Sequence, residues 1–322
     1  MEYNQFLLNI QMEVQKQLGD GFHVQIQRVI KNNDTLLDGL VIRKEQEHLA
    51  PTIYLNPYFE DLKREPDMEV QEIISRILCV YKQNADASFE NGKVEELADF
   101  NNIRNKVAYK LIHRESNQEL LKEIPYVEFL DLAIVFYLIL DESRNGQMTA
   151  LIHTHHMVSW GTTREELYLL AKKNTPELLP AKIRNMEESL EELLKADLGD
   201  FGDIGMVNQL LGAERIPIYV LSNKKMLNGA CCILYENCLE RFAAEQGADI
   251  IILPSSVHES LLILDRDKEN SYEDFSSMVT EINQNEVSEE DRLSNQIYRY
   301  SRSSGTIEIV FQTDKCLINR KL

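Results

Sequence analysis

Residues 248–264, ADIIILPSSVHESLLIL, place two apolar runs on either side of a short polar corner. Each run has the length of a buried strand and is rich in isoleucine or leucine, which favours two strands over one helix. Pro254 ends the first run because proline cannot donate a hydrogen bond to a neighbouring strand. The stretch therefore predicts two buried strands joined by a tight corner, in a sheet on which helices pack.

These two strands belong to an order of elements that the sequence predicts twice beyond residue 100. Each copy reads strand, helix, strand, strand, helix, although the residues of the two copies differ. We therefore expect an α+β protein with mixed or antiparallel sheets, helices packed on them and a twofold β-α-β-β-α repeat. The first copy comprises strands 107–112, 127–140 and 149–158 with helices 116–124 and 164–174, and the second comprises strands 217–221, 249–253 and 260–264 with helices 229–246 and 272–283.

A smaller module precedes the repeat. Apolar residues at helical spacing predict helices over 5–18 and 69–83, and alternating residues predict three antiparallel strands between them. An apolar stripe also predicts an amphipathic helix over 176–197, after the first copy. The domain organisation that follows is 1–100 for the N-terminal module, 101–197 for the first half with its amphipathic helix, 198–215 for a flexible connection, and 216–322 for the second half with a C-terminal strand.

The composition excludes several classes of protein. The chain of 322 residues carries 34 Lys and Arg against 53 Asp and Glu, so its formal net charge is −19. A surface this negative repels phosphate backbones and anionic lipids, which argues against direct nucleic-acid or membrane binding. No apolar run reaches the roughly 18 residues that span a bilayer, and the N-terminal residues do not resemble a signal peptide. The five cysteines include no C-x-x-C pair, which indicates thiols in a reducing cytoplasm.

The sequence HTHH at 153–156 is the first candidate site. On a strand, His153 and His155 would lie on one face, where two imidazoles can bind Zn²⁺ if a third ligand joins them. The third ligand would come from His113, His258 or Glu259. The alternative is a strand whose histidines simply face solvent, and on that interpretation the protein needs no cofactor.

The corner at 255–259 is the second candidate. Ser255 or Ser256 could act as a nucleophile with His258 as its base, and Glu259 lies beside them. However, the stretch has no G-x-S-x-G motif, and serine hydroxyls at a tight corner commonly bond to the backbone. We therefore assign no catalytic residue, and we keep Ser255, Ser256, His258 and Glu259 as ligand-binding candidates.

The third candidate follows the strand that ends near Ser222. Asn223 and Lys224 lead into a loop, and Asn228-Gly229 is expected to open the helix predicted over 229–246. A strand end, a lysine loop and a helix N-terminus together favour binding of a small anion. The alternative is that Asn228 only caps the helix and that the lysines are solvated.

At these places the chain resembles a family of unknown function. The residues that carry the resemblance are LDGLVIR and PTIYLNPYFEDL in the N-terminal module, then WGTTREELYLLAKKNTPELLPA, IYVLSNKKMLNGACCILYENCLE and ILPSSVHESLLI. Together they are similar to the bacterial domain-of-unknown-function family 5688, and more distantly to the YtpQ family. The resemblance extends to about residue 300, and it implies no reaction, cofactor or catalytic residue.

Three functions follow from these observations. We expect a cytoplasmic, non-enzymatic binding or regulatory module, whose cleft is formed by loops at strand ends and whose partner is a small anion or a protein. The first alternative is an acidic protein, of the kind found on mobile elements, that blocks a nucleic-acid-binding partner. The second alternative is a hydrolase or a zinc-dependent enzyme.

Overall fold

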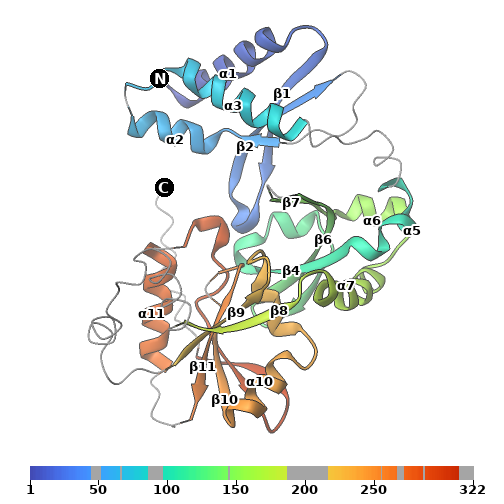
Figure 1. Ribbon diagram of the computed structural model, residues 1–322, viewed down its shortest axis with the longest axis vertical. Helices are drawn as coiled ribbons and strands as arrows, with labels where there is room; N and C mark the ends of the chain where they lie inside the picture. The colour runs from blue at the N-terminus through green and yellow to red at the C-terminus, as the bar shows by residue number, and fades with distance from the viewer. Residues whose placement is uncertain are drawn as a thin grey trace, which may run out of the picture. The chain divides into compact units, whose positions relative to one another are not determined.

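The computed structural model describes residues 1–44, 52–65, 67–85, 97–143, 146–186, 217–254, 256–266, 272–285 and 287–311. The chain divides into two compact units, Met1–Arg104 and Asn105–Leu322 (Figure 1), which are described separately below. The connection predicted at 198–215 lies outside the described residues.

Unit 1 has the predicted order of a helix, a three-stranded antiparallel sheet and a helix. The sheet order is β1-β2-β3, and Ile26 of β1 lies opposite Leu40 of β2. Pro57 occupies the first turn of an additional helix, a position where the missing N–H costs nothing. The elements are α1 (Tyr3–Leu18), β1 (Phe22–Ile30), β2 (Leu36–Lys44), β3 (Thr52–Tyr54), α2 (Asn56–Arg64), α3 (Val70–Ala85) and the short α5 (Phe100–Ile103).

The core of unit 1 follows from the spacing of apolar residues along α1. Phe6, Ile10 and Val14 are fully buried, as expected for residues three to four positions apart on one helical face. They pack in one cluster with Leu40 of the sheet and Ile73 of α3. Burying a side chain of this size contributes about 1.5–3 kcal/mol, so this cluster supplies the main stabilisation of unit 1.

The first sheet of unit 2 is built around one long central strand. Strand β6 pairs antiparallel with three neighbours, and β5 and β7 share one of its edges. Helix α7 packs against β4, where Asn174 Nδ2 donates to the Val107 carbonyl (3.1 Å) and the Tyr109 amide donates to Thr175 Oγ1 (3.1 Å). The elements are β4 (Val107–His113), β5 (Tyr126–Phe129), β6 (Leu132–Ser143), β7 (Gly146–Leu151), α6 (Thr154–Trp160) and α7 (Arg164–Leu178).

Three predictions for this sheet were wrong, and the third, the strand expected over 149–158, is described below with the HTHH sequence. The strand expected over 127–140 is two strands, β5 and β6, separated by a tight turn in which Leu130 has a φ of 54°. The apolar residues on both sides of the turn read as one run because both strands are buried. The helix expected over 116–124 is two short 3₁₀ turns, Glu115–Asn117 and Leu120–Lys122.

The second sheet of unit 2 contains the strands predicted at the opening stretch. Its order is β13-β12-β10-β11-β9-β8, and β10 and β11 pair with Ile250 opposite Leu264. The two central strands are therefore confirmed. The elements are β8 (Ala181–Asn185), β9 (Ile218–Asn223), the 3₁₀ helix η6 (Gly229–Leu234), α10 (Cys238–Gln246), β10 (Asp249–Leu253), β11 (Ser260–Asp265), α11 (Tyr272–Asn285), β12 (Ile297–Ser301) and β13 (Thr306–Phe311).

Helices cover both faces of this second sheet, as Figure 1 shows for α10 and α11. Val279 of α11 packs with Ile251 and Ile263 on one face. On the other face, the ring of Phe242 in α10 lies 5.0 Å from the ring of Tyr219, which stands opposite Leu262. Because side chains alternate along a strand, burial of both faces requires the continuous apolar runs seen in the sequence.

Two further helix predictions were wrong in this region. Residues 181–185 of the expected amphipathic helix form β8, which pairs with β9, and residues 187–197 lie outside the described part. The expected helix over 229–246 is broken into η6 and α10, with Asn237 at a φ of 60° between them. A left-handed residue cannot continue a right-handed helix, so the helical pattern ends there.

A polar network joins the two sheets of unit 2, and we call its four residues the Asp131 network. The carboxylate of Asp131, at the turn between β5 and β6, accepts hydrogen bonds from Ser294 Oγ (2.6 Å) and from the Tyr298 hydroxyl. His113 Nε2 lies 3.8 Å from the same carboxylate. Burial, and then the charge of Asp131, raises the pKa of Tyr298, so its hydroxyl remains a donor.

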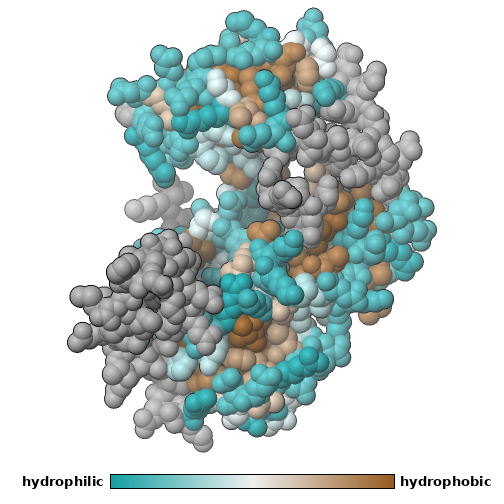
Figure 2. Space-filling model, in the orientation of Figure 1, coloured by the Kyte–Doolittle hydropathy of each residue, from teal (hydrophilic) through white to brown (hydrophobic). Residues whose placement is uncertain are grey.

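The described fold is of the predicted α+β class, with antiparallel sheets. The twofold repeat is not shown, because the two predicted halves enter sheets of four and six strands, and the second sheet takes β8 from outside the second half. Across the described residues, no helix is long and apolar enough to cross a membrane. Figure 2 shows hydrophilic residues over much of the visible described surface, with smaller hydrophobic areas, consistent with the net charge of −19.

Candidate functional site

Three polar regions of unit 2 are candidates, and the first includes the corner predicted at 255–259 together with the segments that the fold brings to it. From here on, the corner means Ser222, Asn223, Gly229, Ser256, His258 and Asp291. Ser222 Oγ donates to the His258 carbonyl (2.7 Å), so the end of β9 is tied to the loop between β10 and β11. A Cβ on Gly229 would lie 2.1 Å from Ser222 Oγ and 2.5 Å from the His258 carbonyl oxygen. Only glycine fits between these two segments.

The loop that follows β9 is fixed by the side chain of Asn223, which is fully buried. Its Oδ1 accepts the amide N–H of Lys225 (2.9 Å), and its Nδ2 donates to the carbonyl of Leu227 (2.6 Å). Lys224 is exposed, and its amide donates to the Pro180 carbonyl (3.0 Å). The Asn223 amide is therefore used within the loop, whereas the Lys224 ammonium points to no described acceptor.

A helical segment begins at Gly229 as expected, but it is a 3₁₀ helix and not the N-terminus of a long α-helix. Asn228 has a φ of 52°, its side chain makes no cap, and the helix that follows is a 3₁₀ segment of 6 residues. A short 3₁₀ segment has no aligned set of free amides comparable to an α-helix N-terminus. An α-helix N-terminus therefore cannot support an anion site here, and Asn223 and Lys224 stay predicted ligand-binding candidates.

His258 has both ring nitrogens engaged. The Asn228 amide donates to Nδ1 (3.2 Å), so this nitrogen is unprotonated and the proton lies on Nε2. Nε2 in turn donates to Asp291 Oδ1 (3.1 Å). Because Nδ1 already accepts the hydrogen bond from the Asn228 amide, it cannot also accept a proton from a nucleophile.

Ser256 also serves the backbone. Its Oγ accepts the His258 amide N–H (3.1 Å), and its own main chain bridges to Arg292. Glu259 is half-buried in the same loop, and Ser255 lies outside the described residues. Ser256 and His258 are therefore close together, but the arrangement of their hydrogen bonds is that of a structural corner.

The second region is HTHH, where the predicted strand was wrong. Strand β7 ends at Leu151, and residues 154–160 form helix α6 with His153 as its N-cap. The His153 amide donates to His156 Nδ1 (3.1 Å), and the His156 ring stacks on Trp160 with centroids 5.5 Å apart. Alternation of polar and apolar residues did not distinguish a strand from the first turn of this helix.

The three histidine rings of α6 lie close together, with the centroids of His155 and His156 4.1 Å apart. Burial, and then the charges of His155 and His153, lowers the pKa of His156 to about 4. Burial likewise lowers the pKa of His153, whose Nδ1 lies 3.8 Å from Glu123 Oε2. Within the described ranges, no group of three or more His, Cys, Asp or Glu is arranged to hold a metal ion. His153 and His155 therefore remain predicted metal candidates only.

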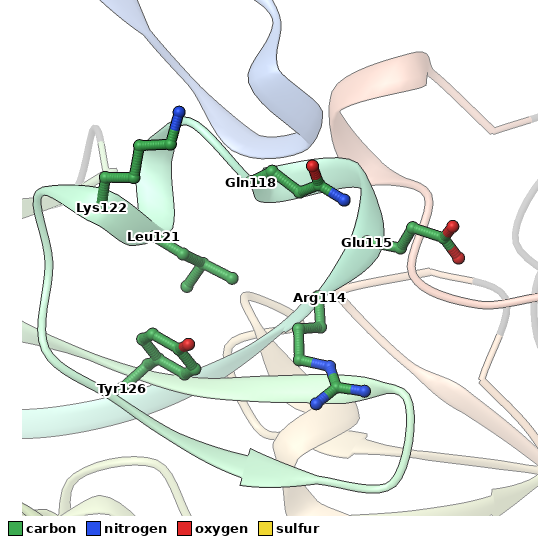
Figure 3. A pocket seen from close by; sticks show the side chains of 6 residues that line it. All are labelled: Arg114, Glu115, Gln118, Leu121, Lys122 and Tyr126. Carbon is green, nitrogen blue, oxygen red and sulfur yellow. The ribbon is translucent and has the colours of Figure 1, made fainter.

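The third region was not predicted from the sequence. It is a pocket of about 450 Å³ formed by the segment after β4 and by the start of β5 (Figure 3). Figure 3 shows Leu121 in the middle of the polar lining side chains. We call this the pocket, and its lining residues are Arg114, Glu115, Gln118, Leu121, Lys122 and Tyr126.

The polar groups of the pocket differ from those of the corner in having few partners. Arg114 Nη1 lies 2.9 Å from Glu128, and Lys122 Nζ lies 2.6 Å from Glu119. Glu115, Gln118 and Tyr126 have no side-chain hydrogen bond or ion pair among the residues that the structure describes. An open concave surface with unpaired donors and acceptors can bind a small polar ligand.

The pocket borders the Asp131 network. The Arg114 amide donates to the Asp131 carbonyl (3.0 Å), and His113, the residue before Arg114, accepts at Nδ1 the amide N–H of Ser116 (3.3 Å). Burial lowers the pKa of His113, which keeps the ring neutral. The only sequence signal for this region was an Arg-Glu pair directly after a buried strand, and this pattern is too common to indicate a site.

The chain was also compared with known proteins. A family model described as "Family of unknown function (DUF5688)" matches residues 3–302. No curated protein and no solved structure matches the chain. The resemblance to this family is thus confirmed, and the matched residues end where expected, close to residue 300. No relation to the YtpQ family is found.

Proposed function

Since the chain belongs to the DUF5688 family of unknown function, we propose a function from its geometry alone: it is a non-enzymatic binding module for a small polar molecule. The observation that carries this proposal is the pocket of about 450 Å³, in which the side chains of Glu115, Gln118 and Tyr126 have no hydrogen-bond or ion-pair partner in the described part of the chain. This volume lies in the range of small-molecule sites. The pocket lies at the end of β4, and the sequence also led us to expect a site at strand ends. The loops that form it are not those at 222–229 and 255–259 that the sequence indicated.

The binding interpretation is preferred to hydrolysis because of the hydrogen bonds at the corner. An enzyme that used Ser256 and His258 would need a free ring nitrogen close to the serine hydroxyl. Nδ1 accepts from Asn228, Nε2 donates to Asp291, and the serine hydroxyl accepts from the His258 amide. The corner therefore supports the loops, and we assign it no reaction.

The proposal also includes a location, a family likeness and a protein partner. Four described cysteines, Cys79, Cys231, Cys232 and Cys238, are free thiols, which fits a cytoplasmic location. The distant likeness to the YtpQ family rests on sequence motifs only. A protein partner, including a nucleic-acid-binding one, stays a prediction based on the net charge of −19.

The proposal is tested by a thermal-shift screen with a library of small polar metabolites. A ligand that binds the folded protein raises the melting temperature, since it adds RT ln(1 + [L]/Kd) to stability. We expect hits with the wild-type protein and with Leu169→Trp, which changes an exposed position of α7. The variant Gln118→Trp, which fills the pocket with a bulky ring, should lose them.

Two results would contradict the proposal. One is a set of hits that Gln118→Trp leaves unchanged, because the ligand would then lie elsewhere. The other is conversion of a hit into a product by the wild-type protein, measured by mass spectrometry, because the module would then be an enzyme.

A further inference from the structure

Strand β8 lies at the end of the second sheet of unit 2, and among the described strands it pairs with β9 only (Figure 1). The Lys224 amide donates to the Pro180 carbonyl (3.0 Å), so this carbonyl points towards the β9 side. Main-chain groups of successive residues point to opposite edges of a strand, so those of Ala181 and Ile183 point away from β9. On that side neither residue has a hydrogen-bond partner in the described chain. Their N–H and C=O groups are therefore available to a further strand.

Two cations lie along the same strand. Lys182 is exposed and Arg184 is half-buried, and because they are two positions apart their side chains share one face of the sheet. Neither has an ion-pair or hydrogen-bond partner in the part of the chain that the structure describes. Strand β8, its neighbour β9 and the loop after β9 contain no Asp or Glu. This edge is therefore locally basic, although the whole chain has a net charge of −19.

The two cations disfavour pairing of β8 with β8 of a second copy. In an antiparallel pair centred on Ile183, Lys182 of each copy would lie opposite Arg184 of the other. A pair centred on either cation would place that cation opposite itself. Like charges directly opposite each other destabilise a pair of strands, and cations on edge strands commonly prevent self-association. The strand that complements this edge is therefore acidic and comes from another protein.

We propose that the outer edge of β8 binds an extended acidic segment of a partner protein as an additional strand. Carboxylates on two alternate residues of this segment lie opposite Lys182 and Arg184, and an apolar residue between them lies opposite Ile183. The Ile183 side chain is on the other face of the sheet, where it stands opposite the fully buried Leu221. In strand addition the main chain provides affinity and the alternating side chains provide specificity. The site does not involve the pocket, so the inference is independent of the proposed small-molecule binding.

The experiment compares peptides of one length by NMR titration of the backbone amides of residues 181–185, at pH 7 and low salt. The probe acetyl-TEVEVT-amide has the proposed pattern, and acetyl-TQVQVT-amide has the same shape without charge. The peptide acetyl-TEPEPT-amide keeps both carboxylates but lacks the two N–H groups that would bond to Ile183 and Ala181. We expect the first peptide to bind about tenfold more tightly than either of the others, because each control lacks two cross-strand contacts of the pair. Added salt should weaken its binding, since the charged contacts are exposed.

A reversal of charge on β8 tests the specificity. The double variant Lys182→Glu with Arg184→Glu should lose binding of acetyl-TEVEVT-amide and gain binding of acetyl-TKVKVT-amide, which the wild-type protein does not bind. The matched control is Lys172→Glu with Lys173→Glu, which reverses two exposed cations on α7. This control should bind the peptides as the wild type does. Wild-type-like amide spectra away from β8 show that each variant is folded, and the gain of a new ligand cannot come from unfolding.

Three results would overturn the inference. The first is the absence of shifts at residues 181–185 with acetyl-TEVEVT-amide. The second is equally tight binding of acetyl-TEPEPT-amide, because the edge would then attract carboxylates without accepting a strand. The third is a dimer in size-exclusion chromatography that the double variant on β8 abolishes, because a second copy would then occupy the edge. None of these results affects the proposal for the pocket.

Discussion

The corner and the pocket are both polar, and both lie where strands of unit 2 end, but they use their polar groups differently. At the corner, Ser222, Asn223, Ser256 and His258 all bond to main-chain groups. In the pocket, Glu115, Gln118 and Tyr126 have no such partners in the described chain. The serine, histidine and asparagine side chains at these two strand ends thus stabilise their loops by hydrogen bonds to the backbone. The surface suited to a ligand lies in a less distinctive stretch.

The largest effect that tests this contrast is expected at Gly229. In Gly229→Ala, the new Cβ would lie 2.1 Å from Ser222 Oγ, 2.5 Å from the His258 carbonyl oxygen and 2.8 Å from the Asn223 amide nitrogen. Two of these atoms belong to the backbone and cannot move easily. We expect the free energy of unfolding to fall by about 3 kcal/mol, measured by urea denaturation.

Gly21→Ala is the matched control, because a Cβ there meets no atom within 4 Å. It should change the free energy of unfolding by less than about 0.5 kcal/mol. If Gly229→Ala were as stable as this control, the corner would not be a tightly packed structural junction, and the contrast with the pocket would lose its basis.

A smaller loss of stability is expected for His258→Ala. This change removes the acceptor of the Asn228 amide and the donor to Asp291. The side chain is 34% exposed, so water can replace part of these bonds, and we expect a loss of about 1–2 kcal/mol. His23→Ala, at an exposed position without a described partner, is the control. A ligand of the pocket should bind His258→Ala as it binds the wild type, and loss of binding would show that the two regions are not independent.

The histidines of α6 extend the comparison, since His156 also accepts a backbone N–H. Its pKa is lowered from 6.5 to about 4 in the folded protein, so only the unfolded chain takes up a proton between these values. Stability is therefore fully present above pH 6.5 and decreases as the pH falls towards 4. The shift corresponds to roughly 3 kcal/mol, which we reduce to about 1 kcal/mol because the ring is partly exposed.

Urea denaturation at pH 7, 5.5 and 4.5 measures this dependence. His156→Gln retains an acceptor for the His153 amide but cannot titrate, so its stability should decrease less than that of the wild type over this range. His23→Gln should behave as the wild type does. Equal slopes for His156→Gln and the wild type would mean that His156 titrates normally in the fold.

The smallest effect on stability is expected in the pocket. Tyr126→Phe removes a hydroxyl that has no described partner, so the free energy of unfolding should change by less than about 0.5 kcal/mol. The affinity for a pocket ligand should fall several-fold, as measured by NMR titration. Tyr168→Phe, on α7 and outside the pocket, should change neither quantity. A destabilised Tyr126→Phe would place this hydroxyl among the structural groups, as at the corner.

The parts of the fold that the sequence predicted correctly are those in which one periodicity dominates. The apolar positions of α1 recur at helical spacing, and the runs of β10 and β11 are continuous because both sheet faces are covered. Periodicity failed at residues 181–185, where apolar residues of a helical pattern form the edge strand β8. Pairing with β9, a segment more than thirty residues away, overrode the local preference.

The candidate sites were less predictable for a related reason. Spacing placed Ser256 next to His258, and the structure does bring them to Asn223, but sequence cannot tell which atoms a hydroxyl or an imidazole will bond. The bonding partners are determined by the close approach of Gly229 to Ser222 and His258 and by the left-handed backbone of Asn228. Both features depend on tertiary contacts. The pocket depends on the curvature of two 3₁₀ turns that have no motif of their own.

The Asp131 network has a consequence for the order in which the protein is made. Asp131 precedes its hydroxyl donors by 163 positions in the case of Ser294 and 167 in the case of Tyr298. A chain leaving the ribosome exposes the first sheet of unit 2 well before β12 is synthesised. Until the last part of the unit emerges, the Asp131 carboxylate of that sheet lacks the hydrogen bonds from Ser294 and Tyr298. A nascent chain stalled before Ser294 would consequently be more open to proteases than one released after β12.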